Sequence, residues 1–140
     1  MQRSLTLDAR RAIVTALVAC SLDYCNVLLY GFAKTEIQLL QTVMNAAARL
    51  VGGLGRYDHF TPVLRDTLHW LSIRQRVVFK LAVLAFDSVR GACPSYFRGV
   101  YTHLTEVSGR LRLRSAQRGD IYVPATRTKV GTRSFRVAAP

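Results

Sequence analysis

HFTPVLRDTLHWLSIRQRVVFKLAVLAFDSVRG, residues 59–91, is the stretch that decides the fold, because it contains the start and stop signals of two consecutive helices. Thr61 followed by Pro62 predicts a helix start. A Thr hydroxyl accepts a hydrogen bond from an unpaired N–H group, and Pro at the first helical position loses no hydrogen bond. We expect this short helix to end near Trp70.

A second, longer helix is predicted from Ser72 to the residues before Gly91. Ser72 and Gln75 have the spacing of a capping box, in which each side chain satisfies the backbone N–H of the other residue. Gly91 suits the left-handed position that follows a helix end. Apolar residues recur at helical spacing, so most of this helix is expected to be buried. The predicted buried face comprises Ile73, Val77, Leu81, Leu84 and Ala85, widened by Val78, Ala82 and Phe86.

Three basic residues, Arg74, Arg76 and Lys80, lie in the N-terminal half of this predicted helix. The helix dipole favours anions at that end and cations at the other. The placement therefore predicts an anionic partner close to these side chains.

Two further helices are predicted before this stretch, one over residues 4–20 and one from Thr35 to the Gly52-Gly53 pair. Their apolar residues follow the i, i+3, i+4, i+7 rhythm of amphipathic helices. Asp23, which lies among apolar residues, requires a partner. The candidates are Arg10, Arg11 and Arg49. The predicted buried faces are Leu5, Ala9, Ala12, Ile13, Ala16 and Leu17 in the first helix, and Ile37, Leu40, Met44, Ala47, Ala48 and Val51 in the second.

The bulk composition indicates one folded domain with a polyanionic partner. The chain has 140 residues, half of them hydrophobic, and a formal net charge of +12. Arg outnumbers Lys by 17 to 3, which favours contacts with phosphates and bases over mere solubility. The net charge increases along the chain, from +2 in residues 1–55 to +4 in 56–100 and +6 in 101–140.

After the long helix, Cys93-Pro94-Ser95 predicts a turn into a short helix over residues 94–104. The apolar residues expected to cover the bundle are Tyr96, Phe97, Val100, Tyr101 and Leu104. The rings next to Arg98 could instead stack on nucleic-acid bases. Core packing is the more common role of such rings and is the interpretation we favour.

From Glu106 onward the pattern changes to short extended runs. Arg110, Arg112 and Arg114 alternate with leucines, and residues 121–124 and 132–137 are strand-like. A row of guanidinium groups is often only a solvated edge, but in so basic a segment phosphate contact is an equally good interpretation. The sequence thus predicts a mainly α fold, with a small helical bundle in residues 1–105 and a basic tail of short strands or extended segments in residues 106–140.

No catalytic arrangement is recognisable in the sequence. The eight acidic residues include no close Asp-Asp pair and no Glu-x-x-His arrangement, so neither a catalytic metal nor paired acid–base chemistry is indicated. A zinc site built from Cys20, Cys25, Cys93 and one of the three histidines lacks a compact CxxC pair to nucleate it. We expect no enzyme activity, no metal and no cofactor.

The three irregularly spaced cysteines argue against a disulfide framework and indicate an intracellular location, nuclear or cytoplasmic. The longest apolar region, residues 12–20, is shorter than the ~20 residues that a membrane helix needs. Arg10 and Arg11 before it, with Cys20 at its end, resemble a bacterial secretion signal with a lipidation cysteine. Because apolar, helix-like sequence continues beyond Cys20, we favour an intracellular protein that does not span a membrane.

A set of short motifs is distributed over nearly the whole chain. They are Leu22-Asp23-Tyr24-Cys25-Asn26, Leu40-Gln41, Asn45-Ala46-Ala47-Ala48-Arg49-Leu50, Thr61-Pro62-Val63-Leu64, Leu68-His69-Trp70-Leu71, Arg74-Gln75-Arg76, Phe79-Lys80, Pro94-Ser95-Tyr96, Val123-Pro124 and Ser134-Phe135-Arg136-Val137-Ala138-Ala139-Pro140. In this order and spacing they resemble the C-terminal region of reverse transcriptases from non-LTR retrotransposons (LINEs) of the CR1, L2 and Jockey-like type.

In that family the region lies downstream of the polymerase palm, at the end of the thumb and in the helical, basic extension after it. The resemblance implies a module that grips template and primer while catalysis happens elsewhere. The family's Tyr/Phe-Ala-Asp-Asp motif does not occur in this sequence, so no catalytic residue carries over. The family pattern continues past Ala-Ala-Pro into a Trp-Asn-containing run, so the chain resembles a fragment of a longer reading frame.

The sequence therefore predicts a non-catalytic module of an RNA-directed DNA polymerase that binds the RNA or DNA backbone. The residues expected to bind are Arg74, Arg76, Lys80, Arg110, Arg112, Arg114, Arg127, Lys129 and Arg133. One alternative is a structural helical module that packs on the palm or fingers of the parent polymerase. Others are a non-functional remnant of a mobile element and, least favoured, a polymerase active by itself.

Overall fold

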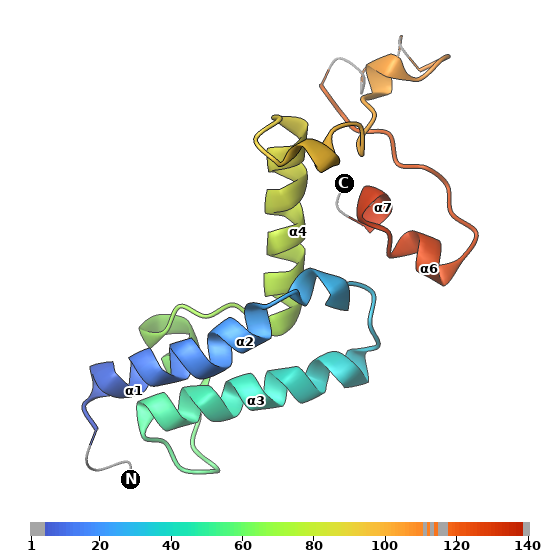
Figure 1. Cartoon of the computed structure of the whole chain (residues 1–140). Helices are drawn as coiled ribbons and strands as arrows, with labels where there is room; N and C mark the ends of the chain where they lie inside the picture. The colour runs from blue at the N-terminus through green and yellow to red at the C-terminus, as the bar shows by residue number, and fades with distance from the viewer. Residues whose placement is uncertain (1–4, 111, 113, 115–117, 139–140) are drawn as a thin grey trace. The chain divides into compact units, whose positions relative to one another are not determined.

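The computed structural model describes residues 5–110, 112, 114 and 118–138, and it is mainly helical, as the sequence predicts (Figure 1). The chain forms two compact units, one extending to Val77 and one beginning at Val78. The division falls within α4 (Ile73–Val89).

The first unit begins with a continuous helical run made of α1 (Leu7–Val14), a π-helical turn (Thr15–Ala19) and α2 (Cys20–Asp23). Thr6 caps this run, because its Oγ1 accepts the N–H of Ala9 at 3.3 Å. In the π-helical turn the N–H of Cys20 bonds to the carbonyl of Thr15, five residues back. The wider turn allows both Val14 and Ala19 to be buried.

The predicted buried face of this run is wrong. Ile13 and Leu17 are exposed, Leu17 by 69%, whereas Val14 is buried and Val18 packs against the same core. The prediction assumed a regular repeat of 3.6 residues, which the π-helical turn interrupts before Leu17. Ile13 precedes that turn, and it is the neighbouring residue Val14 that joins the core. Periodicity located an apolar stripe without identifying the stripe that meets a neighbouring helix.

α3 (Lys34–Gly52) lies alongside α1 (Figure 1). The buried face predicted for α3 is confirmed. The Glu36 carboxylate accepts the N–H of Ala33 at 3.2 Å, which satisfies one backbone donor at the helix start. Gly53 follows the helix at a φ of 65°, the left-handed position expected after a helix end. The fully buried residues are Met44, Ala47, Ala48 and Val51, and Ile37 and Leu40 are half-buried.

The core of the first unit combines small residues of α3 with larger apolar side chains from other segments. Its buried members are Val14, Ala47, Ala48, Val51 and Leu68, covered by Val18, Val63, Leu64 and Trp70. The short helix predicted from Thr61 is present as a helical segment that includes a π-helical turn, Val63–Thr67. It ends before Trp70 because His69 adopts a positive φ of 53°.

The start and end signals of α4 act as predicted. The N–H of Ser72 donates to Gln75 Oε1 at 3.1 Å, and the N–H of Gln75 donates to Ser72 Oγ at 3.4 Å. At the other end, Gly91 has a φ of 71° and donates its N–H to the carbonyl of Ser88. Interactions within a few residues therefore fix both ends of this helix.

The prediction that α4 is mostly buried is wrong. Its buried residues form one narrow face, Ile73, Val77, Leu81 and Ala85, with Leu84 half-buried. Val78, Ala82 and Phe86, which were expected to widen that face, are exposed. The apolar pattern around this helix is wider than the face that is buried.

In the second unit, the helix predicted over residues 94–104 is reduced to a 3-10 turn, Ser95–Phe97. Gly99, with a φ of 78°, turns the chain away, and a second 3-10 turn follows at Leu104–Glu106. The Ser88 hydroxyl donates to the carbonyl of Phe97 at 3.5 Å, so the first of these turns is attached to α4.

The extended segment after residue 118 pairs with residues 102–104. His103 and Ile121 form an isolated antiparallel bridge. On either side of it, the N–H of Tyr122 donates to the carbonyl of Thr102 at 2.8 Å, and the N–H of Leu104 to Asp120 at 3.0 Å. Residues before and after position 105, the predicted end of the helical bundle, thus pack together.

The strand predicted over residues 132–137 is wrong, because two short helices, α6 (Lys129–Thr132) and α7 (Phe135–Ala138), form there. Thr128 Oγ1 accepts the N–H of Gly131 at 3.1 Å, and the Ser134 hydroxyl donates to the carbonyl of Gly131 at 2.8 Å. Such local side-chain bonds favour turns over strands. The predicted alternation at residues 110–114 falls partly on Leu111 and Leu113, which lie outside the described residues.

Candidate nucleic-acid interface

Positive charge is concentrated in the second unit. It contains eleven basic and three acidic residues, a net charge of +8, whereas the first unit contains nine and five, a net charge of +4. After Glu106, Asp120 is the only acidic residue in the sequence. Seven of the nine predicted binding residues belong to this second unit.

Arg76, one of the two predicted binding residues in the first unit, is built into the fold. Its Nη1 forms an ion pair with Asp23 Oδ2 at 2.5 Å, and its Nε donates to the carbonyl of Leu71 at 3.1 Å. The guanidinium carbon also lies 5.7 Å from the centre of the Trp70 ring. The candidate partners of Asp23 from the sequence were Arg10, Arg11 and Arg49, whereas this ion pair is with Arg76.

This ion pair explains part of the unfavourable charge at the start of α4. Asp23 is an anion supplied by the chain itself, and it also accepts a hydrogen bond from Asn26 Nδ2 at 3.2 Å. The Arg76 side chain is only 14% exposed, so a bound phosphate would have to replace its partners. Arg74 and Lys80, by contrast, are exposed on α4.

Arg110 stands over an aromatic ring. Its guanidinium carbon lies 5.2 Å from the centre of the Tyr122 ring, a distance at which a cation is attracted by the ring face. The backbone of Tyr122 is fixed by its hydrogen bond to Thr102. The contact with the Tyr122 ring orients the Arg110 side chain. Because Arg110 is exposed, its N–H donors remain accessible to an anion.

The remaining predicted binding residues are exposed and follow one another along the chain. Arg112 and Arg114 lie in the segment after Leu104–Glu106, and Lys129 is the first residue of α6. Arg133 follows the same helix as its C-cap residue. Arg127 lies in a bend that precedes α6. All five side chains are exposed to solvent.

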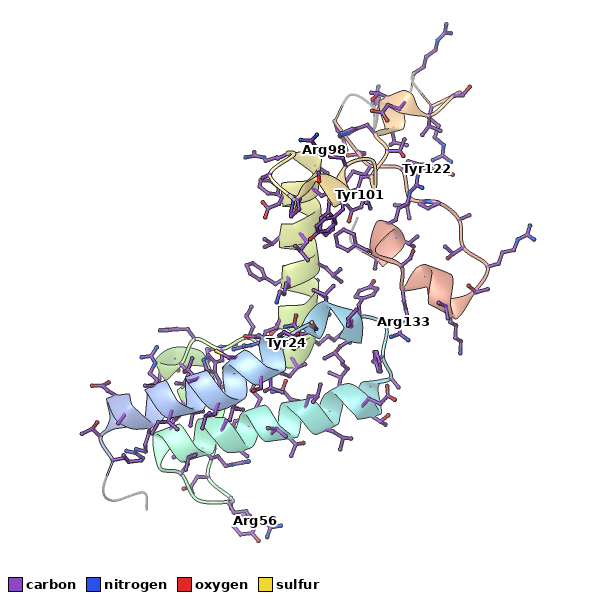
Figure 2. The ribbon with its side chains drawn as sticks, in the orientation of Figure 1. Tyr24, Arg56, Arg98, Tyr101, Tyr122 and Arg133 are labelled. Atoms are coloured by element: carbon purple, nitrogen blue, oxygen red, sulfur yellow. The ribbon has the colours of Figure 1, made fainter. Side chains whose placement is uncertain are left out.

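Four aromatic rings of the second unit form a chain. The ring centres are 4.8 Å apart for Tyr96 and Phe97, 5.4 Å for Phe97 and Phe135, and 5.6 Å for Phe135 and Tyr101. Figure 2 labels Tyr101, whose hydroxyl donates to the carbonyl of Phe135 at 3.4 Å. Burial, with a smaller contribution from Cys93, raises the pKa of Tyr101 to about 12.

The core interpretation holds for only some of these aromatic residues. Phe97 and Tyr101 are half-buried and pack with Phe135, as the core interpretation predicts. Tyr96 is 75% exposed, so it is not a core residue. Sequence spacing alone did not separate them, because both were placed on the same face of a helix that does not form.

Sequence reasoning missed two residues of the candidate interface, Tyr122 and Arg136. Arg136 Nη2 donates to Thr102 Oγ1 at 3.0 Å, next to Phe135 of the ring chain. Its position beside an aromatic residue in a basic segment was the available signal, but residues 132–137 were interpreted as a strand. Tyr122 was treated as part of an extended run, and its partner, Arg110, is twelve residues away in the sequence.

Within the described residues, no three His, Cys, Asp or Glu side chains lie together in a group that could hold a metal ion. No helix in the described part of the chain is long and apolar enough to span a membrane. Comparison of the chain with protein-family models, with curated proteins and with solved structures finds no match.

Proposed function

We propose that this chain is a non-catalytic nucleic-acid-binding module of a non-LTR retrotransposon RNA-directed DNA polymerase. The observation that carries the proposal is the excess of eleven basic over three acidic residues in the second unit. The motif resemblance supplies the parent enzyme class. A surface of this kind suits the phosphate backbone, because each neutralised phosphate releases condensed counterions.

In the proposed mechanism the two units have different roles. The exposed cations of the second unit neutralise phosphates, with Arg110 oriented by Tyr122. The first unit serves as a scaffold in which Arg76 stabilises the packing of α2 against α4 through Asp23. Arg is suited to this task, since its planar fork binds phosphate oxygens in pairs.

The test is the salt dependence of binding to a single-stranded oligonucleotide and to a duplex. Each phosphate contact should contribute a log–log slope of about −0.7 for the single strand and about −0.9 for the duplex. Changing Arg112, Arg114 and Arg127 to Gln should weaken binding and reduce the magnitude of the slope by about 2 for the single strand.

The matched control changes three exposed cations of the first unit, Arg11, Lys34 and Arg56, to Gln. It removes the same net charge from the other unit and should leave most of the slope intact. Equal losses in the two triple variants would mean that net charge alone, and not the second unit, determines binding. Salt-insensitive binding of the unmodified chain, micromolar or weaker, would contradict the proposal.

A second candidate function is that of a helical interaction module that packs on another polymerase domain. Large apolar side chains on the first unit favour it, since Leu17 and Leu39 are 69% and 71% exposed. If these exposed side chains normally meet a partner, the isolated chain should self-associate as its concentration rises. Replacing Leu17 and Leu39 with Ser should then restore a monomer with an unchanged melting temperature, as measured by sedimentation and calorimetry.

A further inference from the structure

Tyr96 is an exposed ring supported by a half-buried one. It is 75% exposed, yet its ring centre lies 4.8 Å from that of Phe97 at an interplanar angle of 38°. An exposed tyrosine ordinarily rotates freely. Contact with a second ring restricts this one and leaves most of its surface open to solvent.

The support for Tyr96 includes further rings of the second unit. Phe97 meets Phe135 edge-on at 5.4 Å, and Phe135 meets Tyr101 at 5.6 Å. The backbone of Phe97 is attached to α4 by the Ser88 hydroxyl, and the Tyr101 hydroxyl bonds to the backbone of Phe135. Tyr96 is therefore the exposed end of a chain of rings whose other members are held by the fold.

Two arginines are adjacent in the sequence to members of this ring chain. Arg98 follows Phe97 and is exposed, and Arg136 follows Phe135 (Figure 2 labels Arg98). Arg136 uses one Nη2 donor on Thr102. Because a guanidinium has five N–H donors, the others remain for an anion. A supported ring with cations beside it has the composition of single-strand binding surfaces.

We propose that Tyr96 is a stacking platform for an unpaired base, with Arg98 and Arg136 binding the phosphates next to it. The ligand class is single-stranded nucleic acid. This inference rests on the proposed nucleic-acid-binding function and adds the form of nucleic acid that the second unit recognises.

A duplex does not fit this platform. Inside a duplex both faces of each base are covered by neighbouring base pairs, so an exposed ring finds a free face only at the helix end. In a single strand every base can unstack and present a face to an aromatic side chain. Phosphate contacts alone, in contrast, are made to single strands and duplexes alike.

Tyr24 provides the matched control. It is 80% exposed and lies in the first unit (Figure 2), and within the described residues no other ring is in contact with it. If exposed tyrosines bound bases without support, Tyr24 and Tyr96 would contribute equally. The stacking platform requires that only Tyr96 contribute.

The experiment measures the affinity of the full chain for three fluorescent probes. They are an oligothymidylate, the same strand with its central bases removed but its phosphates intact, and a duplex of equal length. The proteins are the unmodified chain, Tyr96→Ala, Tyr96→Phe and Tyr24→Ala. Because Tyr96 is exposed, these variants should melt like the unmodified chain, and circular dichroism checks that they do.

Tyr96→Ala should bind the oligothymidylate roughly 5- to 150-fold more weakly, the range expected for loss of one stacked base. Tyr96→Phe keeps the ring and should bind normally, as should Tyr24→Ala. The strand without central bases should bind the unmodified chain about as weakly as the oligothymidylate binds Tyr96→Ala. Tyr96→Ala should have little effect on binding to the strand without central bases or to the duplex.

Two failures are distinguishable. If the unmodified chain binds no probe in a salt-dependent manner, the proposed nucleic-acid-binding function is wrong. If it binds with the expected salt dependence, but Tyr96→Ala is unchanged or the loss of bases has no effect, the function survives and the stacking platform is overturned. An equal loss in Tyr24→Ala would also overturn it.

Discussion

The two units of the chain bury their side chains by different means. In the first, Ala47, Ala48 and Val51 of α3 pack against residues of α1 and of the segment that includes Val63–Thr67. In the second, the described elements after α4 have only three or four residues each. Half-buried aromatic rings supply contacts there, of which Phe135 makes two, beside the buried Leu81, Ala85 and Leu104.

The difference shows how a segment rich in positive charge can be folded. Long helices need extended apolar faces, and these leave little room for cations. An aromatic ring buries about 150–250 Å², so a few rings can support short elements whose other residues are charged. The second unit has a net charge of +8. A polyanion would relieve the self-repulsion of these charges.

The largest expected effect tests the helix-packed core of the first unit. Met44 is 1% exposed, so Met44→Ala should leave a cavity and lower the free energy of unfolding by about 2–5 kcal/mol. Denaturant titration followed by Trp70 fluorescence reports on this unit, because Trp70 packs against its core. Val43→Ala, at an exposed position of the same helix, is the control and should change stability by about 0.5 kcal/mol at most.

A smaller effect is expected when the ring chain of the second unit is broken. Phe135→Leu removes two ring contacts, each of which contributes about 0.5–1.5 kcal/mol, so amide hydrogen exchange should accelerate around Phe97 and Tyr101. Amides of α3 should be unaffected. Phe86→Leu changes an exposed ring of the same unit and serves as control. Equal acceleration in both variants would contradict a specific role of the ring chain.

The smallest effect concerns pH. The pKa of Tyr101 is raised from 10.0 to about 12, so the folded state favours the neutral phenol. Its contribution to stability is complete below pH 10 and is lost as the pH rises from 10 towards 12. The melting temperature of the unmodified chain should therefore fall more steeply in this range than that of Tyr101→Phe. Parallel curves would show that Tyr101 titrates normally in the folded state.

Helix ends were the most predictable part of the fold. Ser72, Gln75 and Gly91 were identified from the sequence and act at the ends of α4 as expected. Each of these interactions joins residues that are three positions apart, so the sequence contains all the information. The strand prediction over residues 132–137 failed because hydroxyl groups of Thr128 and Ser134 bond to nearby backbone and favour turns.

The candidate site was less predictable than the helices. The basic residues of the second unit could be identified from composition, and the structure places six of the nine predicted residues on exposed segments after Leu104. Arg76 looked like the others in sequence, but it pairs with Asp23, 53 positions away. No local pattern distinguishes a cation with a distant partner from one that faces solvent.

By itself the sequence determined that the chain is mainly helical, where its longest helices begin and end, and that its positive charge increases towards the C-terminus. The tertiary structure alone decided which stripe of α1 is buried, which carboxylate pairs with Arg76, and that Tyr96 is exposed while Tyr101 is half-buried. Caps and charge are properties of neighbouring residues. Burial depends instead on which other segment approaches a surface, and that is settled only when segments distant in the sequence pack together.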